Sequence, residues 1–89
     1  MSVFIKVFSF IQGMKYIRHV NFIHKTGERL RTIRELKKIS QQELSYKTEI
    51  SKNQIGRIER GEINFGISTL YELCKALEIT LSDFFKGLD

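Results

Sequence analysis

The chain has 89 residues, of which 42% are hydrophobic and 28% charged, a balance typical of one small globular domain rather than a disordered segment. A single cysteine excludes an internal disulfide and suits a reducing cytoplasm, and no apolar run is long enough to span a membrane as a helix. The net charge of +5 is uneven, because residues 1–25 hold four basic and no acidic residues.

The first 25 residues differ from the rest of the chain. Residues 3–11 are rich in β-branched and aromatic side chains and fit either a strand or a buried helix. This stretch lacks the basic start and small-residue cleavage site of a signal peptide, and Met14 is a candidate for the true start. We therefore predict an apolar and basic extension over residues 1–25 and a folded domain over residues 26–89.

The folded part begins with a predicted amphipathic helix over residues 27–38, with Thr26 as its N-cap. Its apolar face carries Leu30, Ile33 and Leu36 at helical spacing. A second helix over residues 41–47 follows a capping box, the pattern in which a serine hydroxyl and a glutamate three residues later satisfy each other's backbone N–H groups. That box is formed by Ser40 and Glu43, and the helix is expected to bury Leu44 and Ser45.

The third predicted helix covers residues 52–60. The spacing of Ser51 and Gln54 predicts a second capping box, and Gly61 is suited to the left-handed conformation that ends a helix. Ile50, just before this helix, is expected to be buried in the core. The helix itself is expected to bury Ile55 and Ile58. Two short helices joined by a tight turn constitute a helix-turn-helix.

Two further helices complete the domain. One starts near Ser68 and buries Leu70, Leu73, Cys74 and Leu77, and a short last helix is capped by Thr80 with Asp83 and buries Phe84 and Phe85. No convincing strand occurs in residues 26–89. The predicted fold class is therefore all-α, a bundle of five short helices.

The segment from about residue 27 to 86 resembles the Xre, or lambda-repressor-like (Cro/CI-type), helix-turn-helix family. The resemblance rests on many positions in register. They are Leu30-x-x-Ile33-Arg34, Ser40-Gln41-x-Glu43-Leu44, Ile50-Ser51-x-x-x-Ile55-x-x-Ile58-Glu59-x-Gly61, Ser68-Thr69-Leu70 and Leu73-Cys74-Lys75-Ala76-Leu77. It implies a five-helix lambda-repressor-like bundle that binds DNA.

Readers of DNA bases must project from the first turns of the helix that enters the major groove. Lysine and arginine donate to guanine, while asparagine and glutamine pair with adenine. The resemblance implies that the base readers are Lys52, Asn53 and Arg57, with Gln54 close behind. The alternative is that these side chains are ordinary solvated residues of an exposed helix face.

Contacts with DNA phosphates need hydrogen-bond donors but no particular base. By resemblance, Gln41 and Asn64 contact the DNA backbone on either side of the reading helix. Ser51 offers a hydroxyl, although capping is the first role that we assign to both Ser40 and Ser51.

Arg34 and Glu59 lie in otherwise apolar registers and match a paired arginine and glutamate of the family. We expect a largely buried ion pair between the first and third helices; the alternative is two unpaired surface charges. Glu49 departs from the family, which usually has glycine in this turn, and it would be strained if its φ were positive.

One reading helix sees only a few base pairs, so a homodimer on an inverted-repeat operator is expected. Phe84, Phe85 and Leu88 offer apolar surface at the C-terminal end, and Phe84 and Leu88 are the candidates for the dimer contact. The alternative is that both phenylalanines close the core of the monomer, the role that we favour for Phe85. The leading function is a sequence-specific, double-stranded-DNA-binding transcriptional regulator in the cytoplasm.

Two other functions stay open. The first is the antitoxin of a toxin–antitoxin pair, in which residues 1–25 bind a protein partner. The second is a protein that residues 3–23 anchor to a membrane surface. No enzyme, cofactor or small-molecule ligand is predicted, because no activated nucleophile, paired acids or phosphate-binding glycine loop is visible. His19 and His24 have no third ligand nearby for a metal, and Cys74 is expected to be an inert core residue.

Overall fold

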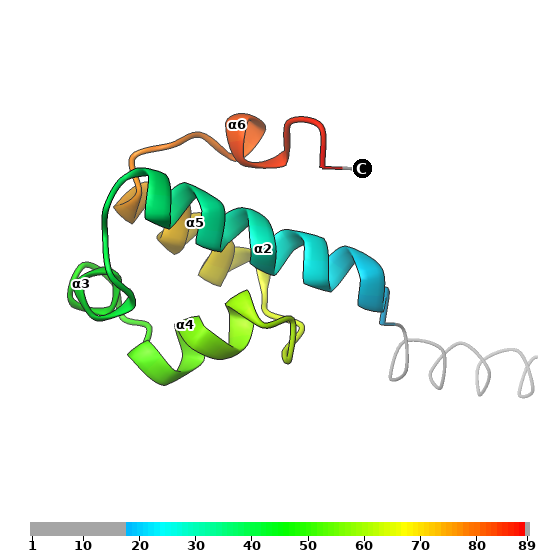
Figure 1. The fold of residues 1–89 in the computed structure, drawn as a ribbon, viewed down its shortest axis with the longest axis horizontal. Helices are drawn as coiled ribbons and strands as arrows, with labels where there is room; N and C mark the ends of the chain where they lie inside the picture. The colour runs from blue at the N-terminus through cyan, green and yellow to red at the C-terminus, as the bar shows by residue number, and fades with distance from the viewer. Residues whose placement is uncertain (1–17, 89) are drawn as a thin grey trace, which may run out of the picture.

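The computed structural model describes residues 18–88 of the chain (Figure 1). Within that range it contains five helices and no strand, so the predicted all-α fold with five helices is confirmed. The helices are α2 (Val20–Leu36), α3 (Gln41–Tyr46), α4 (Lys52–Glu59), α5 (Ile67–Ala76) and α6 (Leu81–Phe85).

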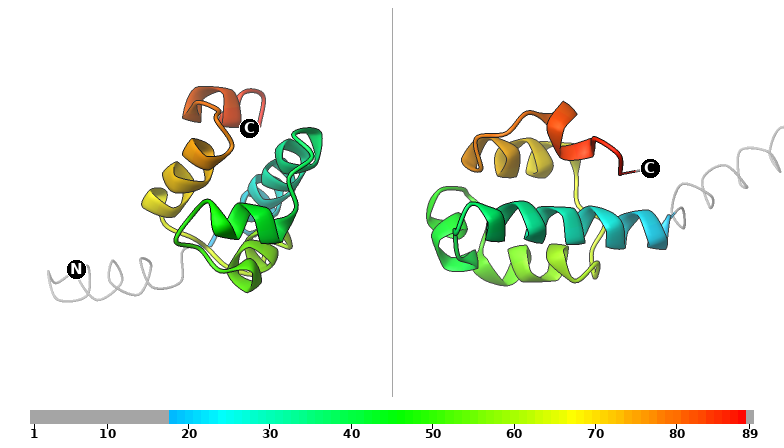
Figure 2. Two further views of the ribbon diagram at one scale, coloured as in Figure 1. Left: turned by 90° about the vertical axis from the view of Figure 1, so that its left-hand side faces the viewer. Right: turned by 45° about the horizontal axis from the view of Figure 1, so that its top comes forward.

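Helix α2 forms one side of the bundle, and α5 forms the other (Figure 2, left). Figures 1 and 2 show α4 on one side of it and α6 on the opposite side, with α5 running alongside α2. The apolar faces of all five helices meet in one core, which excludes water from the contacts between them. The core residues are Leu30, Leu44, Ile50, Ile55, Ile58, Leu70, Leu73, Cys74, Leu77 and Phe84.

The first described helix starts earlier than the sequence predicted. It begins at Val20, and Thr26 is a buried residue in its interior rather than its N-cap. The Thr26 hydroxyl donates to the carbonyl of Phe22 at 2.8 Å, which satisfies the hydroxyl without ending the helix. The helix therefore runs across the predicted division at residues 25 and 26, and that division stays a prediction.

The far end of α2 also differs from the expectation. Leu36 was placed on the apolar face, yet it is 77% exposed. The buried stripe of α2 runs through Leu30 to Arg34, and Leu36, two residues further on, lies on nearly the opposite side of the helix.

The three predicted side-chain caps, at Ser40, Ser51 and Thr80, are present. Ser40 and Glu43 form the full capping box, whereas Ser51 accepts from the Gln54 backbone N–H without the reciprocal bond. Thr80 caps α6 by accepting from the backbone N–H of Asp83. Helix α5 begins at Ile67, one residue before the predicted start, and its N-cap, Gly66, supplies no side-chain bond.

Left-handed residues follow four of the described helices, with Gly87 at a φ of +71° just after α6. Gly61 has a φ of +72°, as expected for the end of α4, and Lys38 and Glu78 have φ values of +57° and +58° just after α2 and α5. Among the described residues with positive φ, Glu49 does not appear, so the strain considered for it does not arise. In that turn the Thr48 hydroxyl donates to the carbonyl of Leu44 and accepts from the N–H of Ile50.

The C-terminal end corrects the predicted dimer contact. Phe84 has no exposed surface and belongs to the core, while Leu88 is only 8% exposed. Phe85 lies partly exposed at the edge of the core, with its ring edge-on to that of Phe84 at 5.2 Å between centroids. The prediction of Phe84 and Leu88 as interface residues is therefore wrong, because both side chains are already enclosed within the monomer.

Several predictions concern residues 1–17, which lie outside the described residues. They are the strand or helix over residues 3–11, the start at Met14, and most of the segments proposed to bind a protein partner (residues 1–25) or a membrane surface (residues 3–23). Among the helices of residues 18–88, none has the length and apolar character that crossing a membrane requires.

Candidate nucleic-acid interface

The predicted reading helix presents one polar flank to solvent. Lys52, Asn53 and Arg57 are exposed, and Gln54 is half-buried. The opposite flank of α4 is buried against α2 and α3 by Ile55, Ile58 and Glu59. The side chains expected to read bases therefore project away from the core, which is the arrangement that a groove-binding helix requires.

A fifth polar residue of this flank, Arg60, was not predicted from the sequence. Lys52, Asn53, Gly56 and Arg60 line one hollow together with Gln41 of α3. Arg60 follows Asn53 by two helical turns, so the helical spacing of the polar residues was the available signal. The prediction gives Arg60 only one role, as the last residue of the helix over residues 52–60.

Glu62 forms ion pairs with two of the arginines of this flank. Glu62 pairs with Arg57, whose Nε lies 3.6 Å from its carboxylate, and with Arg60 on the other side. The hydrogen bond from Arg60 lowers the pKa of Glu62 below its ordinary value, and the same bond raises the pKa of Arg60. All three side chains are about half exposed, so phosphates or bases can replace Glu62 as the partner of either arginine.

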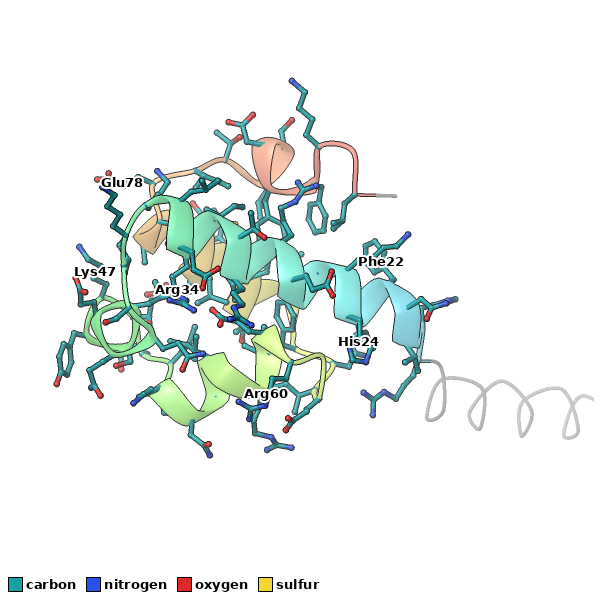
Figure 3. The ribbon with its side chains drawn as sticks, viewed as in Figure 1. Phe22, His24, Arg34, Lys47, Arg60 and Glu78 are labelled. Atoms are coloured by element: carbon teal, nitrogen blue, oxygen red, sulfur yellow. The ribbon has the colours of Figure 1, made fainter. Side chains whose placement is uncertain are left out.

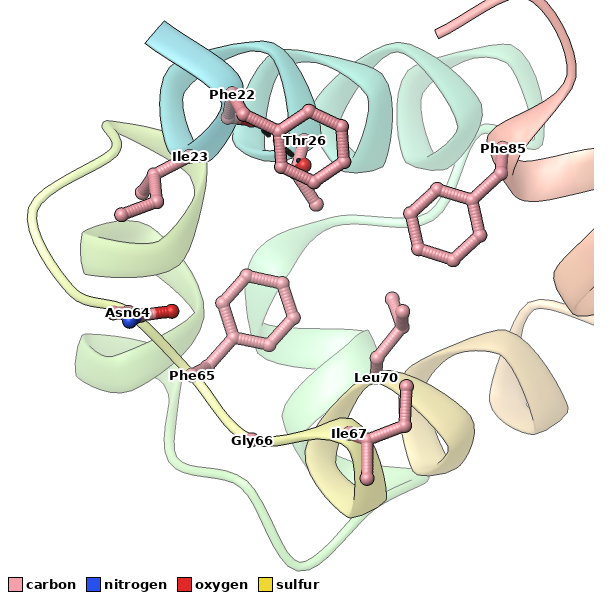
Figure 4. A pocket seen from close by; sticks show the side chains of 9 residues that line it. All are labelled: Phe22, Ile23, Thr26, Asn64, Phe65, Gly66, Ile67, Leu70 and Phe85. Carbon is pink, nitrogen blue, oxygen red and sulfur yellow. Dashed lines mark hydrogen bonds between the residues drawn. The ribbon is translucent and has the colours of Figure 1, made fainter. Parts of the chain in front are cut away.

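Beneath the polar flank lies the ion pair expected from the sequence (Figure 3 labels Arg34). The Arg34 guanidinium donates to both oxygens of Glu59, from Nε at 2.7 Å and from Nη2 at 3.0 Å, and its Nη1 donates to the carbonyl of Ile39. The side chains are 11% and 3% exposed. The bond to Glu59 raises the pKa of Arg34 above its ordinary value, so the guanidinium stays charged.

Gln41 extends this pair to a third helix. Its amide Nε2 donates to Glu59 Oε1 at 2.9 Å, which ties the start of α3 to the end of α4. Arg34, Glu59 and Gln41 thus connect α2, α4 and α3. The amide of Gln41 keeps one N–H and its oxygen for another partner.

The remaining predicted phosphate contacts lie near either end of α4. Ser51 is exposed at the start of the helix, where its hydroxyl serves as the cap. Asn64 is exposed in the loop that follows the helix. Gln41, Ser51 and Asn64 are thus all placed outside the core, and their contact with phosphates stays a prediction.

The histidines, the cysteine and the remaining acids of residues 18–88 are the other candidates for known kinds of site. No group of three or more histidines, cysteines or acids that could hold a metal ion occurs in the part of the chain that the structure describes. Burial raises the pKa of the Cys74 thiol, which keeps it protonated and unreactive. The ring of His24 packs over Gly61, where a Cβ would lie 2.8 Å from His24 Cε1.

Comparison with known proteins gives a family and solved structures of similar fold. The family model HTH_3, described as helix-turn-helix, matches residues 30–84. An uncharacterized HTH-type transcriptional regulator, y4dL, of Sinorhizobium fredii is 35% identical over 54 residues, which cover 61% of this chain. The matched region spans only 28% of the length of that relative.

Two solved structures are similar over most of the described residues. The restriction-modification controller protein C.AhdI of Aeromonas hydrophila is 32% identical with a TM-score of 0.68, covering 71% of this chain and 96% of that one. The controller protein C.Esp1396I, solved as a tetramer with its natural 35-base-pair operator, is 31% identical with a TM-score of 0.71. That match covers 75% of this chain and 88% of the other.

Proposed function

The chain belongs to the helix-turn-helix family HTH_3, and on that premise we propose that it is a sequence-specific DNA-binding transcriptional regulator. It binds double-stranded DNA as a homodimer on an inverted-repeat operator. The family match covers the helix-turn-helix and its supporting helices, and it agrees with the Xre-type resemblance found in the sequence.

The exposed polar flank of α4 is the observation that carries this proposal. Lys52, Asn53 and Arg57 lie on this flank, and the opposite side of α4 is buried in the bundle. These residue types are the donors and acceptors that distinguish bases in the major groove. We assign base contacts to these three side chains and to Gln54, and we add Arg60 as a candidate for either a base or a phosphate.

Phosphate contacts complete the proposed interface. Gln41 has a free amide N–H beside the first turn of α4, and its second N–H is fixed by Glu59. Ser51 and Asn64 would hold the backbone near the two ends of the reading helix. Each of these groups can donate to a phosphate without preferring a base.

The homodimer is supported by the size of the reading surface. An eight-residue helix contacts only a few base pairs, whereas useful specificity requires two copies about one helical turn of DNA apart. C.Esp1396I, which has a similar fold, was solved as a tetramer with its operator. A regulator acts in the compartment that holds its DNA, so we assign the cytoplasm and no catalytic activity.

Selection of bound sites from random duplexes tests this proposal directly. We expect a palindromic consensus, and we expect affinity for that site to fall steeply with salt because phosphate contacts release counterions. Recovery of random sequences would contradict specific recognition. A flat dependence on salt would argue against DNA as the main partner.

Replacing Arg57 with alanine should relax the base preference at one position of each half-site. The expected loss on the preferred sequence is about 1–3 kcal/mol, and it should disappear on a site already changed at that position. Competition binding with a panel of single-base variants measures this. Replacing Gln41 with alanine gives the contrast, since loss of a phosphate contact weakens binding to all sequences alike. A uniform loss for the Arg57 variant would make Arg57 a phosphate contact.

A further inference from the structure

The loop after the reading helix returns an acidic residue, Glu62, to the exposed polar flank of α4. The backbone N–H of Glu62 donates to the carbonyl of Arg57 at 2.9 Å, and that of Gly61 donates to the carbonyl of Ile58 at 3.0 Å. With Gly61 at a φ of +72°, these two bonds form a Schellman motif, which closes a helix and reverses the chain. The backbone of Glu62 is therefore tied to the helix that it follows.

Both oxygens of the Glu62 carboxylate face cations of this flank. Oε1 lies 3.6 Å from Nε of Arg57, and Oε2 accepts a hydrogen bond from Nε of Arg60. The bond from Arg60 lowers the pKa of Glu62, which keeps the carboxylate charged at neutral pH. Since each contact uses the Nε atom, it leaves the two terminal nitrogens of the guanidinium for another partner.

We propose that Glu62 is a specificity-determining residue, which disfavours DNA phosphates as partners of Arg57 and Arg60. The proposal rests on the proposed function, in which the polar flank of α4 enters the major groove. A phosphate carries a full negative charge, so the neighbouring carboxylate repels it. The edge of a guanine offers O6 and N7 without a net charge and escapes this repulsion. Glu62 therefore weakens binding to unrelated sequences more than binding to the operator.

The carboxylate also positions Arg57. An arginine side chain has several rotatable bonds, and an ion pair at Nε restrains the direction of its terminal nitrogens. Those two nitrogens can donate together to O6 and N7 of one guanine. The second oxygen of Glu62 is held by Arg60, which limits rotation of the carboxylate away from Arg57. Glu62 thus acts through the arginine and is a positioning residue for the base contact.

DNA binding by the full chain before and after Glu62→Gln tests the proposal. The amide keeps the size of the side chain and removes its charge. On duplexes without the operator, we expect affinity to rise about 10-fold per bound copy at about 0.1 M salt, with a log–log salt slope steeper by about 0.9, because one added phosphate contact has this effect. Affinity for the selected operator should change by less than about threefold, as for an exposed ion pair, so the ratio of the two affinities falls.

Glu78→Gln is the matched control. It removes the same charge from an exposed residue that Figure 3 shows well away from Arg60, so the ratio of affinities should stay unchanged. Circular dichroism checks that both variants are folded, which we expect because the Glu62 side chain is 45% exposed.

A double variant tests the positioning role. Glu62→Gln should weaken the base preference at the position that Arg57 reads, and this effect should vanish when Arg57 is already alanine. If the effect of Glu62→Gln on base preference persisted without Arg57, Glu62 would contact a base itself and the positioning role would be wrong.

Two results would overturn the inference while leaving the proposed function intact. One is an unchanged ratio of affinities in Glu62→Gln, and the other is an equal fall in Glu78→Gln, which would mean that only net charge matters. An unmodified chain that prefers no duplex would contradict the proposed function and this inference together. Site selection with the unmodified chain detects that failure separately.

Discussion

Replacing Arg34 with alanine should lower the free energy of unfolding by about 3–5 kcal/mol, the usual effect of removing one partner of a buried ion pair. Glu59 would be left without the guanidinium that balances it, in a site where its side chain is only 3% exposed. One N–H from Gln41 would be its remaining side-chain partner. The carbonyl of Ile39 would also lose the donor that Arg34 supplies.

Urea unfolding monitored by circular dichroism measures this loss. The matched control is Arg31→Ala on the same helix, because Arg31 pairs with Glu35 through side chains that are 63% and 56% exposed. That exposed pair should contribute no more than about 0.5 kcal/mol. Equal effects of the two substitutions would mean that burial of the Arg34 pair has no energetic consequence.

A further comparison separates the charge from the packing. Changing both Arg34 and Glu59 to methionine removes the pair without stranding a charge, so stability should return towards that of the unmodified chain. Gln41 would still lose its acceptor on Glu59. This double variant should therefore fold well while binding DNA less tightly, if the fixed amide of Gln41 contacts a phosphate.

The features that the sequence predicts well are those that act over three or four residues. A serine or threonine hydroxyl that caps a helix bonds to the backbone N–H three residues later. The caps at Ser40, Ser51 and Thr80 can therefore be predicted from short sequence patterns. The same holds for Gly61, whose left-handed conformation ends α4. These local signals place the helix-turn-helix and the exposed flank of its second helix.

The features that the sequence predicts poorly depend on how helices meet. Threonine is both a common N-cap and a residue tolerated inside helices, and only the burial of Thr26 in the assembled bundle decides between them. Phe84 and Phe85 are adjacent and chemically identical, so the crossing of α6 over the core determines which one is enclosed. Leu36 was misplaced because the buried stripe of α2 includes Arg34, a charge whose partner lies 25 residues away.

Gly27 is the clearest case of a residue whose role depends on the packing of two helices against each other. It lies inside α2, where glycine lowers helix stability by about 1 kcal/mol relative to alanine. A Cβ at this position would collide with the carbonyl oxygen of Ile58 and lie 2.9 Å from that of Glu59. Glycine is required because the backbones of α2 and α4 touch here.

Replacing Gly27 with alanine should therefore destabilise the domain by about 3 kcal/mol, at the upper end of the usual effect of overpacking. The atoms in the way are backbone carbonyls, which cannot rotate aside as a side chain can, so α4 must move away from α2. That movement would also tilt the reading helix. We expect a lower urea midpoint together with weaker binding to the selected operator.

Gly56→Ala is the matched control, since Gly56 also lies inside a helix and is also buried. A Cβ there meets the Nη1 atom at the end of the Arg60 side chain at 3.0 Å, and that flexible group can shift. The better helix propensity of alanine should then leave stability unchanged or raise it by up to about 1 kcal/mol. If the Gly27 variant were as stable as the Gly56 variant, α2 and α4 would not be in backbone contact, and the support proposed for the reading helix would be wrong.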